Sequence, residues 1–215
     1  DLASRFGKSE TYILQRLKLN ELVREGKKDF FNDRMNLGHA LILARLTPAD
    51  QREIITEMGR HRNGYGTVSD SQDYVDRNVI NSLSLAPFDK DDSDLVKKAG
   101  SCTNCPKRSG ASPLLFAEIR EKDKCFDREC FFTKWTRFTV NKAKEIIESQ
   151  PEMMLLASHQ EPVEEISELI AQHKIKVLRE YDDFNTHGHG KKVKGLWIAG
   201  PKAGYIAQVF VKKES

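Results

Sequence analysis

Residues 2–19 have the sequence LASRFGKSETYILQRLKL, which combines two short helical segments with a turn between them. The first helix is expected to end near Gly7, because glycine readily adopts the backbone conformation of a turn. Ser9 predicts the start of the second helix, since a serine hydroxyl can accept a hydrogen bond from a free backbone N–H group. Ile13 and Leu17 are four residues apart and predict the side of this helix that packs inward.

This pattern is typical of a helix-turn-helix, whose second helix enters the major groove of DNA. Ala3, Gly7 and Ile13 stand where the motif needs a small residue, a turn former and a core anchor. We expect base-edge contacts from Thr11, Tyr12, Gln15 and Lys18, phosphate contacts from Lys8 and Arg16, and a further contact at Ser9. The spacing alone also fits a plain helical hairpin with a polar face.

The rest of the N-terminal part predicts short helices and no strand. Thr47 followed by proline is a typical helix start, because proline is well tolerated at the first helical position. We expect helices over residues 20–25, 36–46, 48–60 and 71–83, and a longer one over residues 131–149.

The hydrophobic pattern changes after residue 150, where short apolar runs alternate with turns. Such runs, bounded by glycine and proline, are typical of strands. We expect strands over residues 153–158 and 176–181, a helix over residues 161–174, and two strands around a Gly-Pro turn within residues 193–213.

All four cysteines lie between residues 102 and 130, with the spacing C-x2-C-x19-C-x4-C. This spacing is close to that of tetrahedral zinc sites, in which a two-residue gap lets one turn present two sulfurs to a single ion. It predicts a structural zinc ion held by Cys102, Cys105, Cys125 and Cys130. Two disulfides, or a redox or metal-free role, remain alternatives, whereas a catalytic zinc would need an open coordination position. Positive side chains expected to offset the thiolate charge are Lys107, Arg108, Lys124 and Arg128.

These elements predict three domains and an overall combination of helices and strands. Residues 1–86 are expected to form a mostly α helix-turn-helix domain, and residues 87–150 a helical zinc-binding connector. Residues 151–215 are expected to form a small α+β domain.

Composition suits a globular protein, since 39% of the 215 residues are apolar and 31% are charged. No apolar run approaches the roughly 18 residues of a membrane helix, and the first residues lack the apolar stretch of a secretory signal. We therefore expect a cytoplasmic protein, associated with the nucleoid or a plasmid, without membrane contact.

Charge is unevenly distributed although the net charge is only +3. Residues 1–62 and 97–147 are basic, with net charges of +3 and +6, whereas residues 63–96 carry −5 and residues 148–215 carry −1. Basic blocks are typical of nucleic-acid binders. Ordinary solvated helix faces would give a similar distribution.

The stretches LASRFGKSETYILQRLKLNELV and NLGHALILARLTPADQREII resemble the helix-turn-helix domain of ParB-type plasmid and chromosome partition proteins. The cysteine segment, with CTNCPKRSG and CFDRECFFTK, is similar to a cysteine-bearing subgroup of that family, and the resemblance covers roughly residues 1–145. It implies specific binding to a centromere-like or operator site on double-stranded DNA, usually as a homodimer, with a partition ATPase as partner. Residues 27–35, KKDFFNDRM, depart from the pattern as an apparent insertion, which puts the packing of the preceding helix in doubt.

The resemblance therefore predicts a sequence-specific DNA-binding protein that acts in partitioning. The family's N-terminal nucleotide-binding domain has no counterpart in the chain, so no enzymatic activity is expected. A transcriptional repressor using the same helices is one alternative, and a protein-interaction module without DNA readout is another. A nuclease would need a cluster of metal-binding carboxylates, and the acidic run at residues 89–94 is more typical of a solvated linker.

Overall fold

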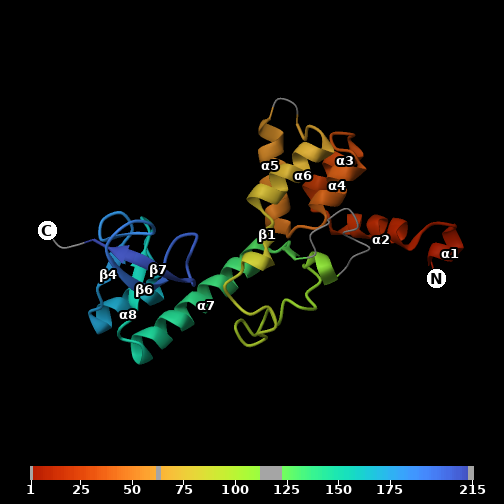
Figure 1. The fold of residues 1–215 in the computed structure, drawn as a ribbon. Helices are drawn as coiled ribbons and strands as arrows, with labels where there is room; N and C mark the ends of the chain where they lie inside the picture. The colour runs from red at the N-terminus through yellow and green to blue at the C-terminus, as the bar shows by residue number, and fades with distance from the viewer. Residues whose placement is uncertain (1, 62–63, 112–122, 213–215) are drawn as a thin grey trace. The chain divides into compact units, whose positions relative to one another are not determined.

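The computed structural model describes residues 2–61, 64–111 and 123–212 (Figure 1). The chain divides into two compact units. The N-terminal unit contains residues 1–85 and 101–131, and the C-terminal unit contains residues 86–100 and 132–215. The residues expected to form a separate connector are thus divided between the two units.

The N-terminal unit consists mainly of short helices, as its sequence predicts. They are α1 (Leu2–Phe6), α2 (Glu10–Lys18), the 3-10 helix η1 (Leu19–Glu21), α3 (Arg24–Phe31), α4 (Leu37–Leu43), α5 (Pro48–Arg60) and α6 (Val68–Asn78). The helices are followed by the short pieces β1 (Asn81–Ser82), η2 (Leu83–Leu85), η3 (Ser109–Ala111) and β2 (Lys124–Cys125).

Capping residues fix where these helices begin. The Thr47 side chain accepts a hydrogen bond from the backbone N–H of Asp50 at the start of α5, and proline occupies the first turn, as predicted. Thr67 and Asp70 form a reciprocal capping box that starts α6 at Val68. The expected helix over residues 71–83 therefore begins earlier, and it ends at Asn78.

The core of the N-terminal unit lies among α3 to α6. Within it, the Gln51 side chain forms hydrogen bonds with the backbone of three other residues. The buried Gln51 amide accepts from Val23 N at 2.8 Å and donates to Glu21 O and Leu46 O, both at 3.1 Å. Buried backbone groups that lack an intrahelical partner need such bonds. Phe126, from the cysteine segment, is also part of this core.

The expected helix over residues 20–25 is wrong in position, because α3 runs from Arg24 to Phe31. Part of the apparent insertion therefore continues a helix instead of separating two of them. Its Asp29 is buried and accepts a hydrogen bond from the Tyr65 hydroxyl at 2.9 Å, and it also pairs with Arg34 at 3.2 Å. These contacts hold the segment in the core. Burial, the larger cause, and the contact with Asp29 raise the pKa of Tyr65, whereas the charge of Arg34 acts in the opposite direction.

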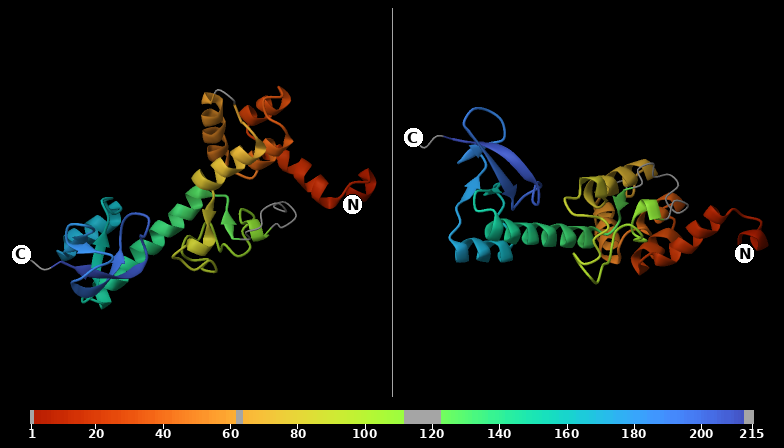
Figure 2. Two further views of the ribbon diagram at one scale, coloured as in Figure 1. Left: turned by 45° about the horizontal axis from the view of Figure 1, so that its top comes forward. Right: turned by 60° about the horizontal axis from the view of Figure 1, so that its bottom comes forward.

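The C-terminal unit is an α+β structure, as expected for this part of the chain (Figure 2). Its elements are α7 (Arg128–Ser149), whose first turn belongs to the N-terminal unit, β3 (Met154–Ala157), α8 (Glu164–His173), β4 (Val177–Arg179), β5 (Phe184–Asn185), β6 (Lys191–Trp197) and β7 (Ile206–Val211). Strand order is β4-β3-β6-β7-β5. The β3 strand pairs in parallel with β4 and β6, whereas β7 pairs antiparallel with β6 and β5. Among the described residues, no helix is both long and apolar enough to cross a membrane.

The two faces of this sheet belong to different apolar clusters. Leu155 and Leu196 pack with residues of α7 and α8, which lie on the same side of the sheet in Figure 2. Leu156 and Trp197 point to the other face, where they pack with Val209. Alternate residues of a strand point to opposite faces, so the β3 and β6 sequences alone account for this division.

Candidate nucleic-acid interface and candidate metal centre

Helices α1 and α2 are joined by a three-residue turn, residues 7–9. Gly7 has φ +60°, a left-handed conformation that disfavours residues with a Cβ atom. The backbone N–H of Lys8 donates to Ala3 O at 3.0 Å and closes the turn. Ser9 then caps α2, since its Oγ accepts from Tyr12 N at 3.2 Å. The predicted turn and helix start are both confirmed.

One side of α2 carries two cations around an aromatic ring. Arg16 lies with its guanidinium carbon 4.5 Å from the ring centroid of Tyr12, and the Lys8 ammonium lies 5.5 Å from it. Positions four residues apart share a helix face, so Tyr12 and Arg16 lie on one stripe of α2, and Lys8, in the preceding turn, extends it through its contact with the same ring. Tyr12 is 38% exposed, which leaves the stripe open to a ligand.

The other side chains predicted to contact DNA differ in burial and in whether they already bond within the chain. Thr11 and Gln15 are half-buried on a second stripe of α2. Lys18 pairs with Glu21 at 2.7 Å, so its charge is already compensated. The Ser9 oxygen is engaged in capping. Lys8, Arg16 and the Tyr12 ring are therefore the strongest candidates for contact with an anionic partner.

The expectation that Leu17 packs inward is wrong. Leu17 is 50% exposed, Phe6 in α1 is 66% exposed, and neither helix contains a fully buried side chain. Among the described residues, the main neighbours of α2 are α1 and η1, and α2 contributes no fully buried side chain to a core. Ile13 is half-buried, and so is Leu14, which the four-residue spacing did not identify.

Two pairs of cysteines come from different local structures of the N-terminal unit. Cys102 and Cys105 lie in a tight turn, in which Cys105 N donates to Cys102 O at 3.3 Å. Cys125 belongs to β2 and forms a bridge with Arg108 in the chain that leaves this turn. Cys130 lies in the first turn of α7, where its N–H donates to the Asp127 side chain at 2.9 Å.

Cys125 lies in a buried environment that disfavours its charged form. Burial is the main cause that raises the pKa of Cys125 to about 12, while a backbone hydrogen bond at Asp127 acts in the opposite direction. Cys102 and Cys125 are both buried, and all four cysteines are free of disulfides. Within the described ranges, however, no group of three or more His, Cys, Asp or Glu side chains is arranged to hold a metal ion.

Two of the arginines expected to offset thiolate charge are paired with carboxylates. Arg108 contacts Asp123 through Nε at 2.8 Å. Arg128 contacts Asp50 at 2.9 Å and also bonds to Glu53, whose pKa it lowers. Arg128 therefore ties the start of α7 to α5. Sequence reasoning missed this link because the partners are 75 residues apart.

Comparison with known proteins gives no relative from which a function could be transferred. The chain matches no protein-family model, no curated protein and no solved structure. What the chain does is therefore inferred from its own residues.

Proposed function

We propose that the chain is a sequence-specific DNA-binding protein of the ParB type that acts in plasmid or chromosome partitioning, with α2 as the helix that reads DNA. The observation that carries the proposal is the short turn with Gly7 at φ +60°, which leads directly into a capped helix whose Tyr12 ring is exposed and lies beside Lys8 and Arg16. A turn of three or four residues containing glycine is typical of helix-turn-helix motifs. The resemblance of residues 1–145 to ParB-type proteins supports the same function.

The side chains of α2 would have two kinds of role. Lys8 and Arg16 would neutralise phosphates, and such contacts supply affinity without sequence information. Gln15 and Thr11 lie on the neighbouring stripe and would face base edges, where glutamine can bond to adenine with both amide atoms. The Tyr12 ring separates Lys8 from Arg16 and would hold the two cations in place. By the same resemblance, the partners would be a second copy of the chain and a partition ATPase.

Selection of bound sequences from a random pool of duplex DNA tests this assignment. We expect enrichment of a defined motif, and a palindrome would indicate a dimer. Replacing Gln15 with alanine should relax the preference at one base pair by about 1–3 kcal/mol. Lys8→Ala should weaken binding evenly across sequences, whereas Lys97→Ala, at an exposed lysine outside α2, should have little effect. An unchanged motif for Gln15→Ala would mean that α2 does not read the bases.

A structural zinc ion held by the four cysteines is the second part of the proposal. The donor set fits, because four thiols on a tight turn, a strand end and a helix start are of the type that binds zinc tetrahedrally. A cation would also allow Cys125 to ionise, which its raised pKa otherwise prevents at neutral pH. Zinc at these residues would link the turn at Cys102 to the start of α7.

Metal analysis of the purified chain tests the zinc proposal. We expect one zinc ion per chain, and we expect zinc to be lost when any one of the four cysteines is replaced with serine. Removal of the metal should lower the free energy of unfolding by on the order of 10 kcal/mol or more. Ser101→Ala, a neighbouring exchange that removes no thiol, is the matched control. A folded, metal-free chain whose intact mass shows two disulfides would contradict this part.

Exposed apolar residues on α1 and α2 favour a second candidate function, a protein-interaction surface. Leu2, Phe6 and Leu17 are all exposed, and exposed large apolar side chains often mark protein contacts when they cluster. Mobility shift on random and selected duplexes across a salt series separates the two functions. A protein-interaction module would bind neither duplex at any salt concentration.

A further inference from the structure

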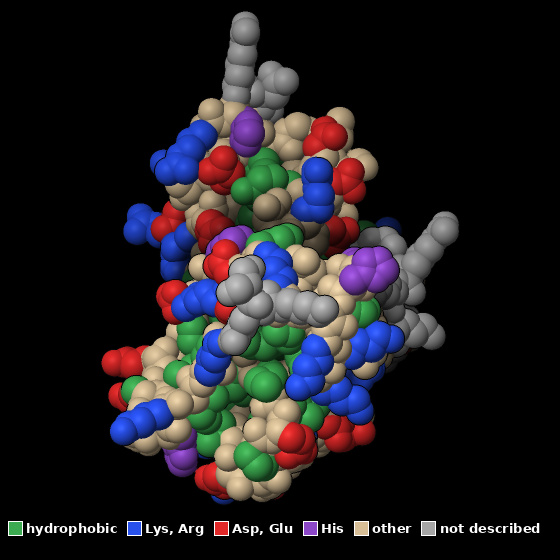
Figure 3. Space-filling view, turned by 60° about the vertical axis from the view of Figure 1, so that its left-hand side comes forward, with side chains coloured by type: hydrophobic (Ala, Val, Ile, Leu, Met, Phe, Trp, Pro, Cys, Tyr) green, Lys and Arg blue, Asp and Glu red, His purple; other side chains and the backbone are tan. Residues whose placement is uncertain are grey.

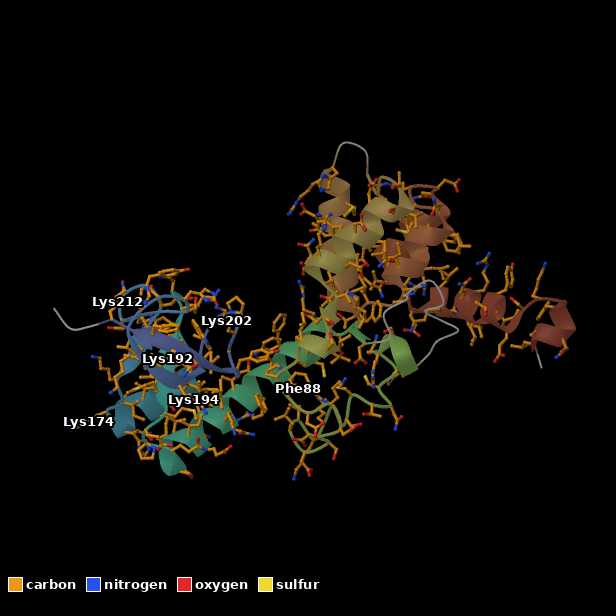
Figure 4. The ribbon with its side chains drawn as sticks, viewed as in Figure 1. Phe88, Lys174, Lys192, Lys194, Lys202 and Lys212 are labelled. Carbon is orange, nitrogen blue, oxygen red and sulfur yellow. The ribbon has the colours of Figure 1, made fainter. Side chains whose placement is uncertain are left out.

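Charge is segregated within the C-terminal unit. Residues 184–212 contain five lysines and not a single Asp or Glu, whereas residues 148–183 contain nine carboxylates and only three Lys or Arg. The near-neutral total for this part of the chain therefore conceals a strongly basic half, which corresponds to β5, β6 and β7. Figure 4 labels four of these lysines, Lys192, Lys194, Lys202 and Lys212, and Figure 3 shows Lys and Arg side chains bordering exposed hydrophobic ones.

Two of these lysines project from one face of the sheet. Lys192 is paired with Phe210 and Lys194 with Gln208 across the β6–β7 ladder, so all four side chains point to the same face. The Lys192 ammonium lies 5.6 Å from the Phe210 ring centroid, which confirms that these two side chains are on the same side. We call the surface formed by Lys192, Lys194, Gln208 and Phe210 the lysine face.

On the same side of the sheet as the lysine face, α7 and α8 cover the part near Leu196. The part that carries the lysine face is exposed. Leu196 follows Lys192 and Lys194 on the same side of β6, and it is buried in the cluster with α7 and α8 residues. By contrast, Lys192, Lys194 and Gln208 are exposed, and Ile206, paired with Leu196, is 47% exposed. The boundary between covered and open sheet thus falls between Lys194 and Leu196.

Among the described residues, no carboxylate pairs with the lysines of the lysine face. In the part of the chain that the structure describes, neither Lys192 nor Lys194 forms an ion pair, whereas Lys202 pairs with Glu180 at 3.8 Å. Arg179 pairs with Glu161 at 2.9 Å in the same unit. Unpaired cations on a rigid, exposed sheet attract a polyanion, and their attraction is not offset by breaking an internal ion pair.

We propose that the lysine face is a second DNA-binding surface, which contacts the phosphate backbone of duplex DNA without sequence preference. Lysine ammonium groups suit this role because they bind phosphates as point charges, and Gln208 can donate further hydrogen bonds. The choice of DNA among polyanions rests on the proposed function of α2. An anionic membrane is the competing partner, and a surface helix with a large apolar side would suit that partner better than a lysine-bearing strand pair.

Fluorescence anisotropy of the full chain with a random-sequence duplex tests the lysine face. The Lys192→Ala/Lys194→Ala double variant should bind roughly tenfold more weakly near 0.1 M salt, and the slope of log affinity against log salt should flatten by about two, because two phosphate contacts are lost. Lys97→Ala/Lys98→Ala is the matched control, since both residues are exposed lysines of the same unit outside the sheet. Lys192→Arg/Lys194→Arg should retain binding.

The outcomes separate this surface from the α2 assignment. Equal affinities and slopes for the Lys192/Lys194 and Lys97/Lys98 variants would overturn the lysine face and leave sequence reading by α2 unaffected. Loss of the selected motif with Gln15→Ala, together with weaker random-duplex binding of Lys192→Ala/Lys194→Ala whose selected motif is unchanged, would support both surfaces. Binding to phosphatidylserine vesicles that depends on Lys192 and Lys194, with DNA binding unchanged, would overturn the DNA assignment of this face.

Discussion

Helix α2 and strand β6 both place a cation near an aromatic ring, but they do so on very different supports. Arg16 lies 4.5 Å from the Tyr12 ring on a helix that has no fully buried side chain. Lys192 lies 5.6 Å from the Phe210 ring on a strand whose other end, at Leu196 and Trp197, is completely buried. The sheet surface therefore has packed support, whereas α2 has α1 and η1 as its main neighbours among the described residues.

The physical reason is the cost of forming a short helix. A nine-residue helix is marginal in water by itself, and most helices in proteins are stabilised by packing of an apolar face. Because α2 has α1 and η1 as its main neighbours, its local stability should be far below that of the sheet. A DNA-reading helix of low local stability would become ordered on its target, and the sheet would bind without such a change.

The largest effect is expected from Trp197→Ala in the C-terminal unit. The Trp197 side chain is almost fully buried and packs edge-to-face on Phe184. Its removal should lower the free energy of unfolding by about 3–5 kcal/mol, measured by urea denaturation. A loss below about 1 kcal/mol would mean that the sheet is not the rigid support we describe.

Gly195→Ala should give the next largest effect. A Cβ at this position would lie 2.6 Å from Leu156 Cγ and 2.8 Å from Met154 O, so the neighbouring strand would have to shift. Overpacking of this kind costs about 1–3 kcal/mol. Urea denaturation measures this loss of unfolding free energy. An unchanged midpoint would show that the β3–β6 contact is looser than the structure indicates.

Gly7→Ala probes the α1–α2 turn. The side chain would meet no atom within 4 Å, but a left-handed φ of +60° costs a residue with Cβ about 1–2 kcal/mol. We expect weaker binding to the selected duplex and an unchanged global unfolding midpoint. Gly59→Ala is the matched control, because Gly59 lies within α5 with open space and should gain about 0.5–1 kcal/mol. Equal behaviour of the two variants would contradict the role of the turn.

Leu17→Ala should give the smallest effect. Since Leu17 is half exposed and belongs to no apolar core cluster in the described part of the chain, the free energy of unfolding should change by no more than about 0.5 kcal/mol. Leu156→Ala, at a fully buried leucine, should cost about 2–5 kcal/mol in the same assay. A large loss for Leu17→Ala in the isolated chain would mean that α2 is packed more firmly than we infer.

Local signals in the sequence predicted much of this structure. Ser9 and Thr47 cap helices as expected, since capping depends on a few consecutive residues. Strands β3, β4 and β7 and the helix α8 also lie within the expected ranges, because alternation and turn residues are local features. Strand β6 begins two residues before its expected range, at Lys191, and β5 lies in a segment for which no strand was expected. The turn at Gly7 and the candidate residues of α2 were predictable in the same way.

Long-range relations were not predictable from one sequence. The spacing of Ile13 and Leu17 identifies an apolar side of α2, but it carries no information on whether another element covers Leu17. The lysine face depends on the pairing of Lys192 with Phe210, which only the sheet register determines. Likewise, the link from Arg128 to Asp50 joins residues far apart in the chain.

Amide hydrogen exchange of the chain, free and bound to its selected duplex, tests the central claim most directly. We predict that the backbone amides of Glu10–Lys18 exchange rapidly in the free chain and become protected on the duplex, while the Lys191–Trp197 amides that bond to neighbouring strands stay protected throughout. If the α2 amides show the same exchange with and without the duplex, α2 is not the element that binds DNA.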